Sequence, residues 1–61
     1  MSQEEVRIML NNYIAQSGIK AKKVCESINL NEPVLSLFRK GRKELWPEHL
    51  QALEDYLKSR I

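Results

Sequence analysis

The sequence of 61 residues has one cysteine, one histidine, two glycines and two prolines, and no long run of apolar residues. A single cysteine excludes an intramolecular disulfide, so the chain suits a reducing compartment. Without a long apolar run we expect no membrane span and no signal peptide, and we predict a cytoplasmic protein with no membrane partner. No alternation of apolar and polar residues is long enough to predict a strand.

The groups needed for catalysis are also scarce. His49 and Cys25 lie in different segments, and neither is accompanied by the acid, nucleophile or glycine-rich loop that acyl or phosphoryl transfer needs. Two soft ligands cannot complete a tetrahedral metal site. We therefore predict no enzyme, no metal, no cofactor and no small-molecule substrate, and we expect Cys25 to be a buried, unreactive core residue.

Charge is distributed unevenly along the chain, although the net charge is only +2. Residues 20–43 contain seven basic and two acidic residues, a net charge of +5, whereas the remainder contains three basic and six acidic residues, a net charge of −3. Such asymmetry is expected of a protein that meets a polyanion with one face.

Apolar spacing predicts a single all-α domain over residues 1–61, with four helices near 3–17, 21–28, 32–40 and 47–59. Ser2 and Glu5 have the spacing of a capping box at the first helix start, and Gly18 is expected to end that helix. Pro47 is typical of the first turn of the last helix. The solvent side of the first helix is predicted to carry Arg7, Asn11, Asn12 and Gln16.

The two middle helices are predicted to bracket a tight turn at Asn29, Leu30 and Asn31, since asparagine tolerates the left-handed backbone conformation. Leu30 can fold back onto the core. Pro33 suits the first turn of the second middle helix, capped by Asn31 or Glu32, and Gly41 suits its end. Their inward apolar residues are predicted to be Val24, Cys25, Ile28, Leu35 and Phe38.

This spacing resembles the phage-repressor and Cro type, or lambda-repressor-like, helix-turn-helix domain. The resemblance runs without a gap from Ser17 to Lys43, and Pro47, Leu50, Leu53 and Leu57 are similar to the following helix of that domain. Its positions here are Ser17, Gly18, Ile19, Val24, Cys25, Ile28, Asn29, Leu30, Leu35, Ser36, Phe38 and Gly41. The resemblance implies a compact bundle of four short helices and sequence-selective binding of double-stranded DNA in transcriptional regulation, of the repressor type.

In that family the outward positions of the second middle helix enter the major groove and read bases. The matching residues here are Glu32, Pro33, Ser36, Leu37 and Lys40. The family commonly has glutamine where Ala21 and Glu32 stand. Ala21 lacks a side-chain contact to phosphate, and Glu32 places a negative charge near a polyanion.

Two basic clusters stand at the edges of the motif and are predicted to contact phosphates on the backbones that flank the groove. One cluster begins the first middle helix, where free backbone amides also attract phosphate. The other ends the second. They consist of Lys20, Lys22 and Lys23, and of Arg39, Arg42 and Lys43, with Lys40 beside them.

Three questions stay open at this point. Pro33, Val34 and Leu37 form an apolar set, so the alternative function is a protein-binding adaptor or antirepressor on the same scaffold. Trp46 is predicted to cover the core between the third and fourth helices, with a dimer contact as the alternative. The chain ends directly after the fourth helix, which leaves both a stable homodimer and a monomer that pairs only on DNA.

Overall fold

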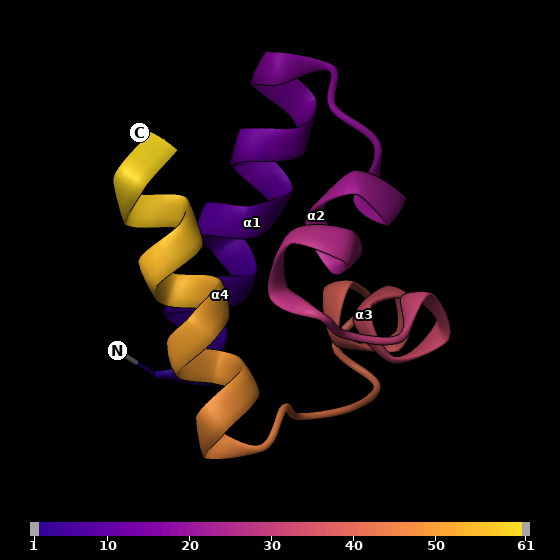
Figure 1. The fold of residues 1–61 in the computed structure, drawn as a ribbon. Helices are drawn as coiled ribbons and strands as arrows, with labels where there is room; N and C mark the ends of the chain where they lie inside the picture. Colours follow the sequence, from indigo (N-terminus) through magenta and orange to yellow (C-terminus); the bar gives the residue numbers. More distant parts are fainter. Residues whose placement is uncertain (1, 61) are drawn as a thin grey trace.

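The computed structural model describes residues 2–60 and contains four helices: α1 (Gln3–Ser17), α2 (Ala21–Ile28), α3 (Glu32–Arg39) and α4 (Pro47–Arg60). Each predicted boundary is confirmed to within one residue, and residues 2–60 contain no strand. α1 and α4 lie side by side and run in the same direction, while α2 and α3 pack across them (Figure 1). The result is an all-α globule of 24 × 22 × 19 Å. No helix in the described range is both long and apolar enough to cross a bilayer.

Local chemistry explains the ends of α1. The Ser2 hydroxyl accepts a hydrogen bond from the Glu5 backbone N–H, and the Glu5 carboxylate accepts one from the Ser2 N–H, both at 3.2 Å. This reciprocal pair confirms the predicted capping box and satisfies two otherwise unpaired amides. At the other end Gly18 has φ 71°, and its N–H donates to the Ile14 carbonyl. A side chain at this position would strain the backbone.

The connection between α2 and α3 is a tight turn. Asn29 has φ 57°, so the left-handed conformation predicted for it is confirmed. The backbone N–H groups of Asn29 and Leu30 both donate to the Cys25 carbonyl, which closes the end of α2. Leu30 folds back against the core, and Asn31 is the N-cap residue of α3 without a side-chain cap bond.

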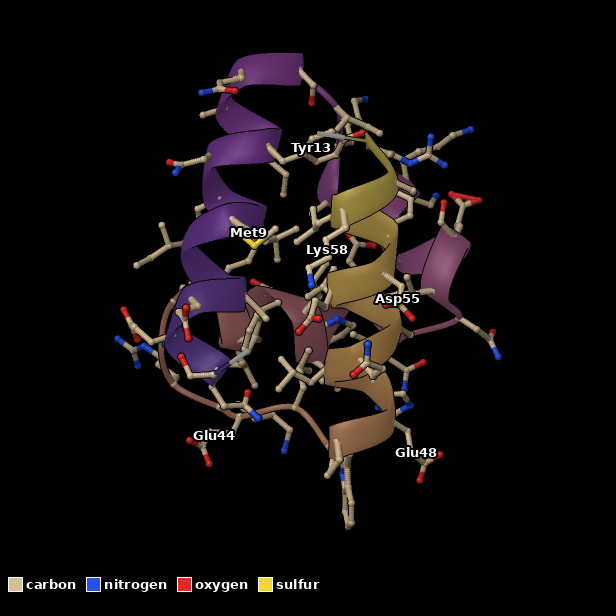
Figure 2. The ribbon with its side chains drawn as sticks, turned by 90° about the vertical axis from the view of Figure 1, so that its left-hand side faces the viewer. Met9, Tyr13, Glu44, Glu48, Asp55 and Lys58 are labelled. Atoms are coloured by element: carbon tan, nitrogen blue, oxygen red, sulfur yellow. The ribbon has the colours of Figure 1, made fainter. Side chains whose placement is uncertain are left out.

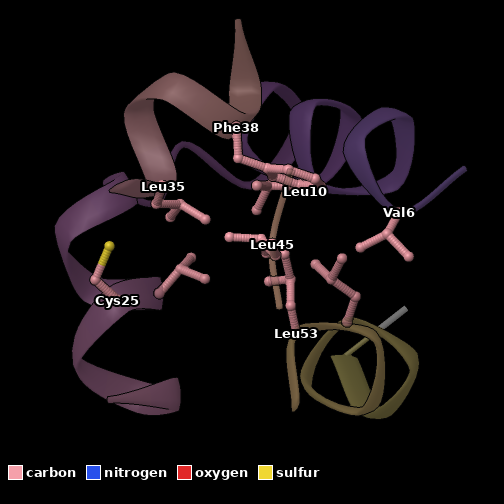
Figure 3. Packing of buried hydrophobic residues seen from close by; sticks show 9 residues of the cluster. Val6, Leu10, Cys25, Leu35, Phe38, Leu45 and Leu53 are labelled. Carbon is pink, nitrogen blue, oxygen red and sulfur yellow. The ribbon is translucent and has the colours of Figure 1, made fainter. Parts of the chain in front are cut away.

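One hydrophobic core joins all four helices. Cys25 is 4% exposed within it, which confirms its predicted burial, and Figure 3 shows Leu45 between the α1 and α4 side chains. The core residues are Val6, Leu10, Val24, Cys25, Leu35, Phe38, Leu45, Leu53 and Leu57.

The prediction that Trp46 covers the core is wrong. Trp46 is 69% exposed, and its neighbour Leu45 is the buried residue of the connection. The Gln3 side-chain amide explains this register: its Nε2 donates to the Leu45 carbonyl at 2.9 Å, and its Oε1 accepts from the Leu45 N–H at 3.0 Å. Leu45 is thus held inward, while Trp46, whose carbonyl accepts from the Leu50 N–H at 2.8 Å, is left exposed at the start of α4.

Side chains also join α1 to α4 near their other ends. The rings of Tyr13 and Tyr56 meet edge to face with centroids 6.1 Å apart. Glu54 on α4 is only 8% exposed, and its carboxylate accepts a hydrogen bond of 3.0 Å from Lys58. Lys58 lies one turn further along α4 (Figure 2). A carboxylate held in this way is stabilised in its charged form.

We predict that Glu54 makes the stability of the fold sensitive to acid. The hydrogen bond from Lys58 is the foremost cause that lowers the pKa of Glu54 below 4.5. Because the folded pKa is lower than the unfolded one, the contribution is present above pH 4.5 and is lost as the pH falls through the folded pKa. Urea unfolding of Glu54→Gln should therefore give a shallower loss of stability below that pH.

The control for this prediction is Asp55→Asn, which removes an exposed carboxylate from the adjacent position of α4. It should keep the acid dependence of the unaltered protein. An equal flattening of the pH profile by both variants would mean that general charge repulsion, and not the Glu54–Lys58 contact, causes the acid sensitivity.

Candidate nucleic-acid interface

The outward face of α3 is set by its buried face. Leu35 and Phe38 are fully buried, and a helix turns through about 100° per residue, so side chains roughly opposite to them point to solvent. Positions three and four apart share that outward face. It carries Pro33, Ser36, Leu37 and Lys40.

The base-reading residues predicted from the sequence therefore gather on one helix face. Pro33, Leu37 and Lys40 are exposed, and Ser36 is half-buried among them. Glu32 is also exposed but lies toward the edge of this face. It is on the same side of the helix as Arg39, which follows about two turns later. Its carboxylate is thus placed at the rim and not at the centre of the face.

The burial of Val34 differs from the prediction. It is half-buried and packs against the core, so it does not belong to an exposed apolar set with Pro33 and Leu37. Leu37 remains 41% exposed. The apolar surface on α3 is consequently one leucine beside one proline, smaller than the sequence indicated.

The first basic cluster surrounds the start of α2. Lys20, Lys22 and Lys23 are all exposed, and Lys20 is the N-cap residue. No side chain caps this end, and its first turn carries no acidic residue. Unpaired amides, the positive end of the helix dipole and three ammonium groups together favour an anion here.

The second basic cluster follows the end of α3. Lys40, Arg42 and Lys43 are exposed, and the chain turns at Gly41 with φ 77°. The Arg42 N–H donates to the Leu37 carbonyl at 2.9 Å, which fixes the start of this segment against α3. The cations are therefore held near the helix end and do not extend on a long free loop.

None of the seven cations between Lys20 and Lys43 forms an ion pair with a residue of the described range 2–60. The two ion pairs found there, Arg7 with Glu4 and Lys58 with Glu54, involve only basic residues outside that stretch. Glu44 and Glu48 project into solvent around the start of α4 (Figure 2). Glu26 and Glu32 are exposed on α2 and α3 and form no ion pair with these cations, so the seven basic residues outnumber the acidic ones there and are not ion-paired within the described part of the molecule.

Arg39 differs from the other cations because it is tied to α1. It is half-buried, and its Nε donates to the Asn11 Oδ1 at 3.0 Å. The Asn11 Nδ2 in turn donates to the Arg39 backbone carbonyl at 3.3 Å. From the sequence, Arg39 was predicted only to contact phosphate, and its bond to Asn11 was not predicted.

Arg7 and Asn11 were predicted to lie on the solvent side of α1, and that prediction is wrong. They lie one turn apart on the face that meets the end of α3, and both are half-buried. The Arg7 Nε donates to the Phe38 carbonyl at 2.6 Å, and its guanidinium carbon lies 4.8 Å from the centre of the Phe38 ring. Asn11 thus supplies a donor to the Arg39 carbonyl at the helix end, and Arg7 adds a second donor to the Phe38 carbonyl, which also accepts from the Gly41 N–H at 3.1 Å.

An open concavity of about 310 Å³ lies beside the turn between α2 and α3. Burial is the main cause that raises the pKa of the Cys25 thiol at its base, which makes this thiol a poor nucleophile. No cluster of metal-ligating side chains occurs within residues 2–60. The concavity is lined by Lys22, Cys25, Glu26, Asn29, Leu30, Asn31 and Glu32.

Comparison with known proteins adds nothing to this geometry. No family model, no curated protein and no solved structure matches the chain. Any assignment of function therefore depends on the placement of the charged and outward residues described above.

Proposed function

We propose that this chain is a lambda-repressor-like helix-turn-helix domain that binds double-stranded DNA selectively and regulates transcription as a repressor. In this proposal α3 enters the major groove, with Pro33, Ser36, Leu37 and Lys40 facing the bases. The major groove admits an α-helix, and its pattern of donors and acceptors distinguishes all four base pairs. The protein would act in the cytoplasm.

The observation that carries the proposal is the pair of basic clusters without ion pairs at the two ends of the α2–α3 unit. Cations without carboxylate partners do not have to break an ion pair when they contact phosphate. The counterions that are released from DNA supply a large part of the affinity. Lys20, Lys22 and Lys23 supply one flank, and Arg42 and Lys43 supply the other.

Two residues at the edges of the proposed interface differ from the glutamines that are common in the family. Ala21 is half-buried and packs against the core, so its side chain contributes to packing and makes no phosphate contact. Glu32 lies at the edge of the outward face of α3, where its carboxylate could accept from the amino group of cytosine. These features favour readout by a small number of contacts over readout by a bidentate arginine, glutamine or asparagine.

The test is a titration of ¹⁵N-labelled protein with a mixed-sequence DNA duplex at low salt, followed at every backbone amide. We expect shifts to concentrate at residues 20–23 and 32–43 and to disappear as salt is raised. If the signals of these amides do not shift, the proposal fails. The hypothesis to test is then a protein partner for the surface formed by Pro33 and Leu37. That alternative would be supported by a second protein whose addition at high salt shifts the amide signals of Leu37 and of the residues that flank Pro33.

The exposed side chain of Leu37 offers a test of whether α3 reads bases. Its side chain is 41% exposed and apolar, so it can lie against a thymine methyl group. We expect Leu37→Ala to change the preferred sequence in a binding-site selection, with a loss of about 1–3 kcal/mol confined to one base position. An equal loss of affinity at all sequences would exclude Leu37 from base readout.

A further inference from the structure

The contact between α1 and the end of α3 orients the side chain of Arg39. Its Nε is committed to Asn11, whereas no residue of the range 2–60 accepts a hydrogen bond from its two terminal nitrogens, Nη1 and Nη2. The guanidinium is planar and rigid, so fixing one nitrogen fixes the direction of the other two. Arg39 is therefore oriented before any ligand arrives.

Asn11 holds both the backbone and the side chain of Arg39. Its Nδ2 donates to the Arg39 carbonyl at 3.3 Å, while its Oδ1 accepts from the Nε at 3.0 Å. One amide thus links the end of α3 to α1 and aligns the guanidinium with the helix end. Arg7, one turn earlier on α1, holds the neighbouring Phe38 carbonyl and limits rotation of the same turn.

We infer that Asn11 is a positioning residue for a phosphate contact made by Arg39, and this inference rests on the proposed DNA binding. Lys40, Arg42 and Lys43 are exposed and have no bond of this kind, so each must be ordered when it meets a phosphate. An arginine that is already ordered loses less side-chain entropy on binding. Arg39 therefore anchors the register of α3 on the DNA backbone, and Asn11 acts only through it.

The geometry is testable without DNA. In the free protein the Arg39 Nε–H should give a resolved, slowly exchanging NMR signal that Asn11→Ala shifts toward the signals of solvated arginines. Asn12→Ala, which changes an exposed asparagine at the adjacent position, should leave this signal in place. An Arg39 signal that already resembles solvated arginine in the unaltered protein overturns the inference.

The coupling is tested by a double-mutant cycle on binding to a mixed-sequence DNA duplex. We expect Asn11→Ala to weaken binding about three- to tenfold, because Arg39 must then be ordered as it binds, which is the cost of immobilising one long side chain. In the Arg39→Lys background, which keeps the charge but has no guanidinium fork, Asn11→Ala should have a much smaller effect, because only its bond to the backbone carbonyl of residue 39 remains to be lost. Additive losses in the two backgrounds would show that Asn11 does not act through Arg39 and would overturn the inference.

Two further results separate this inference from the proposed function. If Arg42→Ala weakens binding but Asn11→Ala and Arg39→Lys do not, DNA binding stands and the role of Asn11 is overturned. If the unaltered protein does not bind the duplex at any salt concentration, the proposed function and the inference both fail. Because Arg39→Lys conserves charge and size at a half-buried position, the cycle stays interpretable if Asn11→Ala lowers stability.

Discussion

Phe38→Ala is expected to remove most of the stability of the fold at room temperature. Phe38 is fully buried in the core, where Figure 3 shows it beside Leu10. Truncating a buried phenylalanine costs about 3–5 kcal/mol, because transfer energy is lost and a cavity remains. A domain of this size has a stability on the order of 5 kcal/mol, so little would be left. Circular dichroism during urea unfolding measures the loss.

The matched control is Leu37→Ala at the preceding position. Leu37 belongs to the same helix but is 41% exposed, so its truncation should change the free energy of unfolding by only about 0.5 kcal/mol. Similar destabilisation by both variants would contradict the assignment of the inward and outward faces of α3. It would then also remove the basis for placing Leu37 against DNA bases.

The helix boundaries could be predicted from the sequence because each depends on neighbouring residues. Ser2 and Glu5 bond to each other, and Gly18 and Asn29 adopt left-handed conformations that few other residues tolerate. The inward residues of α3 followed from their spacing alone, since burial on a short helix follows its period. All of this information is contained within a few positions of the chain.

The contacts between distant residues could not be predicted in the same way. Gln3 bonds to the backbone of Leu45, 42 positions away, and that bond decides that Leu45 and not Trp46 enters the core. Size and hydrophobicity favoured the tryptophan. A polar side chain that selects the register of a distant connection leaves no periodic pattern in the sequence.

The polar face of α1 shows the same limit at the candidate site. Apolar spacing separates the stripe that enters the core from the rest of the helix, but it does not reveal that Arg7 and Asn11 face the end of α3. The i and i+4 spacing of these two residues was visible, yet their partners are backbone carbonyls, which every residue has. The two basic clusters were predictable because charge can be counted, whereas the fixed orientation of Arg39 required the structure.

In the proposed DNA complex, Arg42→Ala combined with Lys43→Ala should produce the largest loss of binding. Both cations are exposed beyond the end of α3 and have no ion pair within residues 2–60. Each phosphate contact contributes about 0.9 to the slope of log K against log salt, so the slope should fall by about two. At a salt concentration of about 0.1 M the same relation gives a loss on the order of a hundredfold. Fluorescence anisotropy with a labelled duplex over a salt series measures both quantities.

A control with the same change in net charge distinguishes a local contact from general attraction. Lys58→Ala with Arg60→Ala also removes two positive charges, but from the end of α4, outside the basic clusters. If binding depends on phosphates beside α3, this control should keep the salt slope and lose little affinity, provided that a thermal melt shows both variants folded. Equal losses from the two pairs would mean that DNA responds to net charge alone. In that case the α2–α3 unit would have no privileged orientation on the duplex, because only contacts at fixed positions can make the slope depend on which cations are removed.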